Sequence, residues 1–105
     1  MICRLWRGWT TPENADAYER IVRGEVIPGI EARQIPGFRH IDLMKRDLGD
    51  EVEFQTLMWL DSVDAIKAFI GDDYSVSHVP AAARAVLKRF DGRAAHYEVI
   101  DRREQ

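Results

Sequence analysis

The chain has 105 residues and a formal net charge of −3, with 46% hydrophobic and 31% charged residues, which predicts one folded domain over residues 1–105. This charge, with arginines scattered along the chain, excludes a general nucleic-acid-binding protein. The single cysteine, Cys3, excludes an internal disulfide, and no apolar run approaches the ~20 residues of a membrane span, so we expect a cytoplasmic protein without a membrane partner.

The first third of the chain predicts a strand followed by a long helix. Polar and apolar residues alternate over about residues 2–9, which is typical of a strand. Thr10 or Thr11 can cap the helix that follows, in which apolar residues recur at helical spacing. Pro28-Gly29 should end or kink this helix, with a short continuation beyond it.

The remainder predicts a hairpin, two short helices and a last strand. Strands are expected over residues 38–48 and 51–60, joined by a tight turn at Gly49-Asp50. A short helix should extend from Asp61 or Ser62 to about Gly71, and a second one over residues 79–90. Residues 93–101 form the expected fourth strand, before a charged tail.

This order of elements predicts an α+β fold of the ferredoxin-like split βαβ type. Such a fold has a four-stranded antiparallel sheet with its helices on one face. The expected helix of roughly 16 residues would span ~24 Å, close to the ~26 Å of an eight-residue strand. The lengths of the elements therefore agree with the fold.

Apolar residues on both faces of the predicted strands indicate that both faces are covered. On the third strand Phe54 and Met58 point one way and Leu57 and Trp59 the other. On the second strand Phe38, His40 and Met44 are expected opposite Ile41 and Leu43. One chain supplies helices for one face only, so the simplest cover for the other is a second copy, in a symmetric homodimer.

His78 is the most promising candidate for acid–base chemistry. The three histidines, His40, His78 and His96, lie on three different elements, which gives no spacing typical of a metal site. His78 precedes a predicted helix, whose N-terminus favours a neutral imidazole able to accept a proton. Tyr74 would add a phenol to the same rim, although each of the two residues also fits an ordinary structural role.

Three tryptophans on predicted strands can act as core residues or as pocket walls. Trp6 and Trp9 are separated by an odd number of residues, so they face opposite sides of the first strand. Trp59 lines a pocket if its face of the sheet carries the helices. If it does not, Trp59 fills the dimer interface.

The sequence resembles the antibiotic biosynthesis monooxygenase family along nearly its whole length. The segments that carry this resemblance are "RLWRGWT", "IPGFRHIDLMKRDLGDEVEFQTLMWLDSVDAIKAFIGDD" and "VLKRFDGRAAHYEV". The resemblance implies a ferredoxin-like domain that forms a dimeric α/β barrel. It also implies a cofactor-independent monooxygenase, without metal or flavin, that acts on a small aromatic or polyphenolic substrate.

Within that resemblance, cofactor-free oxygenation needs a base, donors for an oxyanion and a dry aromatic pocket. His78 is the expected base and Tyr74 a donor. The expected walls are Trp6, Trp59 and Phe69. Arg39, or one of two arginines on the first strand, Arg4 and Arg7, would stabilise a phenolate.

Two alternatives share this fold. The first is a non-enzymatic dimer that binds a ligand or acts in a stress response. The second is haem degradation, for which His78 stands close to the position of the iron ligand. However, Phe69 stands near the position of the expected Trp, and the first strand lacks the expected Asn, so this alternative is the weaker one.

Overall fold

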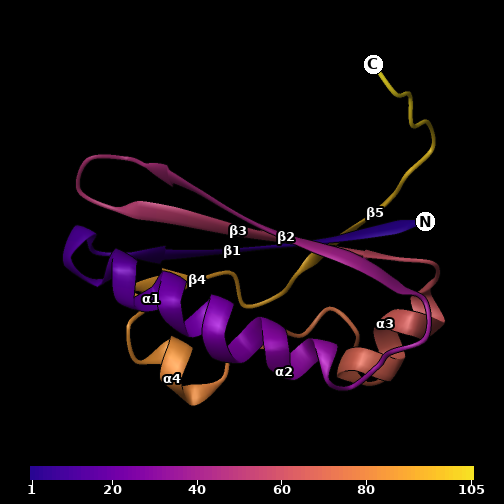
Figure 1. Ribbon diagram of the computed structural model, residues 1–105, viewed down its shortest axis with the longest axis horizontal. Coiled ribbons are helices and arrows are strands. Elements are labelled where there is room, and N and C mark those ends of the chain that lie inside the picture. The colour runs from indigo at the N-terminus through magenta and orange to yellow at the C-terminus, as the bar shows by residue number, and fades with distance from the viewer.

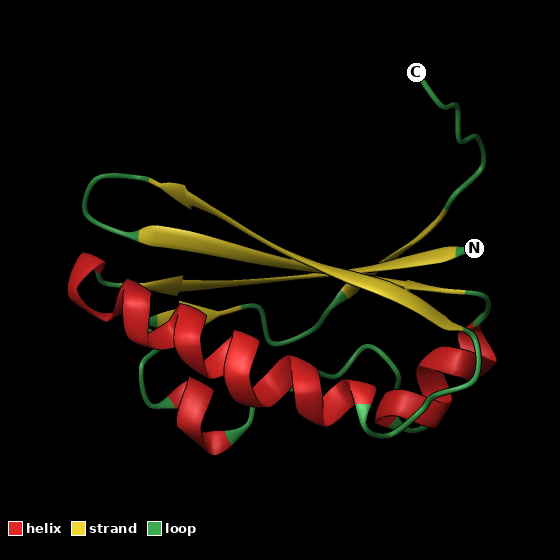
Figure 2. Cartoon of the chain, viewed as in Figure 1, coloured by secondary structure: helices red, strands yellow, loops and turns green.

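The computed structural model describes residues 1–105 as two layers, an antiparallel sheet with helices on one of its faces (Figures 1 and 2). The strands are β1 (Ile2–Thr10), β2 (Phe38–Asp47), β3 (Val52–Leu60), β4 (Arg89–Phe90) and β5 (Ala95–Glu98). The helical segments are η1 (Pro12–Asn14), α1 (Ala15–Ile21), η2 (Val22–Val26), α2 (Ile27–Glu31), α3 (Val63–Ile70) and α4 (Ala81–Arg84). The predicted α+β fold of split βαβ type is confirmed.

The sheet has the strand order β2-β3-β1-β4. The strand β5 also pairs directly with β1, at Ile2 to Leu5, whereas β4 pairs with Gly8 and Trp9. The sequence predicts one fourth strand over residues 93–101, but the structure divides this edge into two strands. Between them the backbone of Ala94 leaves β1 and donates to the oxygen of Ser75 at 2.7 Å, while Val76 and Arg93 form an isolated bridge. The sheet therefore has five strands, and it is open within one chain.

The long helix passes through Pro28 without ending there. The segment η2 is a π-helix, and the amide of Ile27 donates to the oxygen of Val22, five residues earlier. A proline in a regular helix clashes with the carbonyl four residues before it, here that of Gly24. The wider π turn directly before Pro28 accommodates its ring. The sequence predicts that Pro28-Gly29 ends or kinks the helix with a short continuation beyond it, and the structure has this continuation, which reaches Glu31.

The two short helices differ in how well the sequence predicts them. In α3 the side chain of Ser62 accepts a hydrogen bond from the amide of Ala65 at 3.2 Å, which confirms the expected cap. The helix predicted over residues 79–90 is only the single turn α4. After it the amide of Lys88 donates to the oxygen of Trp9 at 2.8 Å, and this pairing with β1 ends the helix and begins β4.

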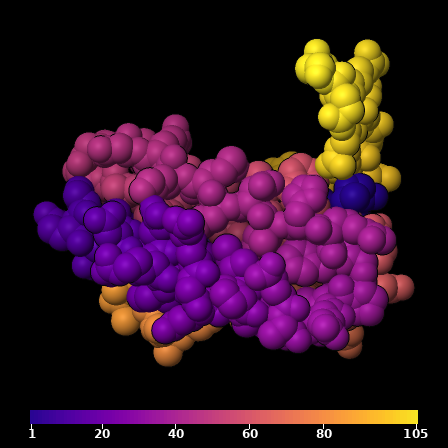
Figure 3. All heavy atoms as spheres, in the orientation of Figure 1, coloured from indigo at the N-terminus to yellow at the C-terminus, as the bar shows by residue number.

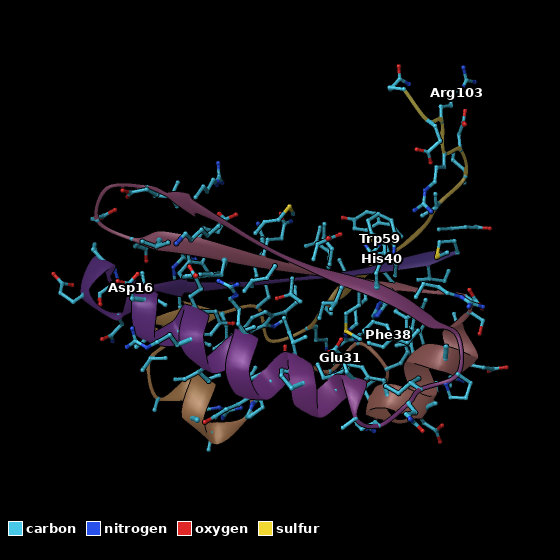
Figure 4. All side chains as sticks on the ribbon, in the orientation of Figure 1. Asp16, Glu31, Phe38, His40, Trp59 and Arg103 are labelled. Carbon is cyan, nitrogen blue, oxygen red and sulfur yellow. The ribbon has the colours of Figure 1, made fainter.

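The helices cover the face of the sheet that carries Trp6, Phe54 and Met58, and Trp9 lies on the other face as predicted. Phe38 is an exception to the predicted alternation. A bulge between Phe38 and His40 shifts the register of β2, so Phe38 packs in the core under the helices. Figure 4 shows Phe38 on the helical side and His40 and Trp59 on the other.

The second face of the sheet has no helical cover (Figure 2). Leu5 and Leu57 lie opposite each other on it, and Tyr97 remains 58% exposed. The charged tail after β5 projects away from the helical layer (Figure 3), and within it the guanidinium carbon of Arg102 lies 5.1 Å from the ring centroid of Trp59. We call this surface, formed by Leu5, Met44, Leu57, Trp59 and Tyr97, the open face. None of the helices has the length and apolar character required to cross a membrane.

Candidate active site

A cavity of about 50 Å³ lies between the sheet and the helical layer. Most of its walls are apolar, and both layers contribute to them. The lining residues are Arg4, Trp6, Tyr18, Val22, Val26, Ile27, Ile30, Ile41, Thr56, Met58, Phe69, His78, Val79, Pro80 and Ala83. Ligand pockets usually enclose roughly 300–1,000 Å³, so a bound aromatic molecule requires these walls to move apart.

His78 borders this cavity on the segment that leads into α4. Its ring packs edge to face on Phe69, with ring centroids 5.1 Å apart. His78 is exposed on its solvent side, and partial burial of its ring, followed by the nearby charges of Arg33 and Arg4, lowers the pKa of His78 below its ordinary value of 6.5. The imidazole is therefore neutral at pH 7 and able to accept a proton.

The reason for this neutral histidine differs from the one the sequence suggests. The sequence places His78 at the N-terminus of a helix, whose dipole would disfavour the imidazolium. The structure has only one turn there, beginning at Ala81. Desolvation and two arginine charges lower the pKa of His78 instead.

Phe69 and Trp6 both line the cavity, as the sequence predicts for walls. Phe69 is buried and has the guanidinium carbons of Arg4 and Arg33 at 5.5 and 5.3 Å from its ring centroid. Trp6 is held in place through its indole Nε1, which donates to the backbone oxygen of Asp91 at 2.8 Å. Both rings are thus fixed, as a preorganised aromatic wall requires.

Tyr74 lies near the site but does not line the cavity. Its ring packs edge to face on His96, with centroids 5.2 Å apart. Its backbone oxygen, rather than its phenol, accepts a hydrogen bond from Arg4. The structure therefore brings the backbone of Tyr74 toward the site, and a donor role for its hydroxyl stays a prediction.

Trp59 and Arg39 are not brought to the cavity. Trp59 lies on the open face, where its indole Nε1 donates to Asp42 at 3.0 Å and its ring packs on His40. Arg39 is exposed, and its Nε donates to Asp61 at 2.8 Å. Their roles in substrate binding stay predictions, and they would meet a ligand only outside the cavity.

Arg4 is a charged residue of the cavity wall that sequence analysis does not single out. From the sequence, Arg4, Arg7 and Arg39 are alternative candidates for stabilising a phenolate. Only Arg4 is buried and lines the cavity. The available signal is its spacing of two from Trp6 on β1, which places both side chains on one face. The sequence alone does not tell which face the helices cover.

No group of three or more histidine, cysteine, aspartate or glutamate side chains is arranged to hold a metal ion. Cys3 is buried, and the pKa of its thiol is raised, first by burial and then by the charge of Asp42. Its thiolate form is therefore disfavoured. The ionisable side chains that line the cavity are His78, Arg4 and Tyr18.

The sequence matches no protein-family model and no curated protein. Its fold does match solved structures. A protein from Bacillus cereus assigned as an antibiotic biosynthesis monooxygenase has a TM-score of 0.72 at 14% identity, over 100% of this chain and 96% of that one. The predicted resemblance in fold is confirmed.

Two further structures support the same fold. Rv0793 from Mycobacterium tuberculosis has a TM-score of 0.62 at 18% identity, over 98% of both chains. SnoaB from Streptomyces nogalater, a cofactor-independent oxygenase, has a TM-score of 0.53 at 17% identity, over 96% of this chain and 95% of that one. At these identities the similarity establishes the fold, and the activity has to be argued from the site.

Proposed function

We propose that the chain is a cofactor-independent monooxygenase that acts on a small aromatic substrate bound between the sheet and the helices. The observation that carries this proposal is a histidine with a lowered pKa, His78, at the rim of an apolar cavity. The fold shared with SnoaB, a cofactor-independent oxygenase, supports it.

The reaction requires only an electron-rich substrate and molecular oxygen. Neutral His78 removes a proton from an activated CH₂ group of an anthrone-like ring, which leaves a carbanion conjugated with the ring oxygen. This anion gives one electron to O₂, and the two radicals combine into a peroxide. Loss of the remaining C–H proton and cleavage of the O–O bond give a carbonyl and hydroxide, which takes the proton from His78 to form water. One O₂ is consumed for each carbonyl and each water formed.

The cavity walls suit this chemistry because they exclude water. Trp6, Phe69 and Met58 are buried and present apolar surface to the substrate. A dry site keeps the carbanion from being protonated by solvent before oxygen reacts with it. We assign the substrate contacts to these side chains, together with His78.

The decisive experiment measures oxygen consumption with a panel of anthrones and hydroquinones in the presence of a metal chelator. Wild-type protein should consume O₂, and His78→Ala should reduce the rate at least tenfold, within the range expected for loss of a general base. His40→Ala is the matched control, because His40 lies on the open face. Equal rates in wild type and His78→Ala would exclude the assigned base.

A second candidate function is ligand binding without turnover. The small volume of the cavity favours it, since walls that enclose about 50 Å³ must move apart to admit a ring and must move further to admit O₂ beside it. Under this alternative the aromatic panel changes the fluorescence of Trp6 in a saturable way while the oxygen concentration stays constant. Oxygen consumption under the same conditions excludes it.

We also propose that the chain acts as a homodimer in which a second copy covers the open face. Leu5, Leu57 and Trp59 lie there without helical cover, and Ile100 beyond β5 is 90% exposed. Extended apolar surface of this kind is typical of an interface. Two open sheets packed face to face would supply the closed barrel that one chain lacks.

A measurement of the oligomeric state tests the proposed homodimer directly. Light scattering after size exclusion should give twice the 12.1 kDa mass of one chain at micromolar concentration. Leu57→Arg should shift the protein toward the single-chain mass, since it places a charge in the centre of the interface. Leu48→Arg, in an exposed turn, is the control. A wild-type particle of 12.1 kDa would contradict the dimer.

A further inference from the structure

Arg4 is the one buried arginine of the chain, with 3% of its surface exposed, and no carboxylate pairs with it. The exposed arginines behave differently. Seven of them form ion pairs with aspartate or glutamate: Arg7, Arg23, Arg39, Arg46, Arg89, Arg93 and Arg103. Buried charges in folded proteins are normally paired, because an unpaired charge loses its hydration without compensation. The unpaired charge of Arg4 therefore indicates a missing partner.

The acceptors that Arg4 does have are all neutral. Nη1 donates to the backbone oxygen of Tyr74 at 2.5 Å and to Nε2 of His96 at 3.0 Å. Nη2 donates to the backbone oxygen of Val76 at 2.7 Å. A guanidinium has five N–H donors, so the Nε–H and one Nη2–H have no acceptor within the chain. Burial without an acidic neighbour lowers the pKa of Arg4 to about 10, which still leaves the side chain charged at pH 7.

The cavity that Arg4 lines contains no acidic side chain. Phe69 forms its wall, with Arg4 on one side and Arg33 as a second cation nearby. His78 is neutral at pH 7 and adds no charge of its own. The site is therefore positive inside a chain whose formal net charge is −3. An anionic ligand would compensate Arg4, whereas a neutral one would leave it unpaired.

We propose that Arg4 binds an ionised oxygen of the ligand, so that the substrate class of the cavity is small aromatic monoanions, either phenolates or carboxylates. This rests on the proposed function in that it uses the same cavity. It goes further because it states the charge of the ligand and the group that recognises it. A second consequence is that a phenol bound beside Arg4 ionises more readily than in water.

The test measures binding rather than turnover. 4-Nitrophenol and 4-nitrobenzoate are the anionic probes, and 4-nitroanisole is the neutral ether of matched shape. Titration of wild-type protein at neutral pH should show at least tenfold tighter binding of an anion than of the ether, as expected for a hydrogen bond to a charged group. Tighter binding of the phenolate or of the benzoate identifies which oxygen the site takes.

The absorbance of the phenolate gives a readout that a purely structural role would not change. Bound 4-nitrophenol should ionise at lower pH than free 4-nitrophenol in wild type, and this shift should disappear in Arg4→Met. Arg4→Lys should keep part of it, since the charge remains while the planar donor group is lost. Arg20→Met, at an exposed position on α1 that does not line the cavity, removes the same charge and should change neither property.

Arg4→Met also removes hydrogen bonds to Tyr74, Val76 and His96 and can fail to fold, but the comparison of probes on wild-type protein does not depend on it. Equal affinity of wild type for the ether and for both anions overturns the proposal. No oxygen is consumed in this assay. Anion-selective binding without oxygenase activity would therefore contradict the proposed function alone, and oxygenase activity without anion selectivity would contradict the role of Arg4 alone.

Discussion

The guanidinium of Arg4 donates a hydrogen bond to Nε2 of His96 across 3.0 Å. An arginine has no acceptor, so Nε2 must accept, and the single proton of the imidazole lies on Nδ1. Burial and the charge of Arg4 both lower the pKa of His96 below 6.5. The pair thus joins a permanent cation to a neutral histidine at the edge of the cavity.

We predict that His96 is in the Nδ1–H tautomer and that its titration midpoint lies below 6.5. Nitrogen-15 NMR of the ring measures both properties. Arg4→Met should move the midpoint upward, because the repelling charge is removed. An Nε2–H tautomer in wild type, or a midpoint above 6.5, would show that the hydrogen bond is not formed.

The free energy of unfolding should decrease as the pH falls from about 6.5 toward 4.5. In this range His78 and His96 are protonated in the unfolded chain but resist protonation in the folded one. The unfolded state therefore binds more protons, and acid favours it. Above 6.5 both states are neutral at these positions, so this contribution is fully present.

Denaturant unfolding at a series of pH values measures this dependence, and the double variant His78→Gln with His96→Gln should flatten it. Glu51 becomes important only at lower pH. Hydrogen bonds from Arg89 and Lys88 lower the pKa of Glu51 to about 2 from 4.5. A wild-type stability that stays constant between pH 6.5 and 4.5 would disprove the histidine contribution.

Phe54→Ala should destabilise the fold by about 3–5 kcal/mol, the usual cost of removing a buried phenylalanine. Phe54 is 0% exposed and packs on Tyr18, with ring centroids 4.7 Å apart. Leu48→Ala, in the exposed turn after β2, is the control and should cost less than about 0.5 kcal/mol. Urea unfolding of both variants measures the difference, and equal midpoints would contradict the assigned core.

Val79→Ala should increase the affinity for two-ring aromatics more than for one-ring aromatics. Val79 lines the cavity and is only half-buried, so its truncation enlarges the site at modest cost in stability. Val76→Ala is the matched control, since Val76 is 37% exposed and lies outside the cavity. Fluorescence titration measures the affinities. The same change in both variants would place ligand binding elsewhere.

Local patterns in the sequence were sufficient for the elements and for most side-chain directions. The alternation in β3 separates Phe54 and Met58 from Leu57 and Trp59, as the structure confirms. Where a local irregularity intervenes, alternation alone fails. The bulge beside Phe38 turns this side chain into the core, and the bonds of β1 to Lys88 shorten the last helix to one turn.

The candidate site depended more strongly on tertiary structure. The sequence identifies His78 but attributes its neutrality to a helix that is too short, whereas burial and two arginines are responsible. It leaves open whether Trp59 lines the pocket or faces away from the helices, and the structure places Trp59 on the open face.

By itself, the sequence determined which residues share a face of each strand, because side-chain direction follows from the backbone period. Only the tertiary structure decided which face the helices cover, and hence that Arg4 is buried and Trp59 is not. The physical reason is that burial and unpaired charge arise from contacts between residues far apart in the chain. The guanidinium of Arg4 donates hydrogen bonds to residues 74, 76 and 96, and no local sequence pattern predicts these long-range contacts.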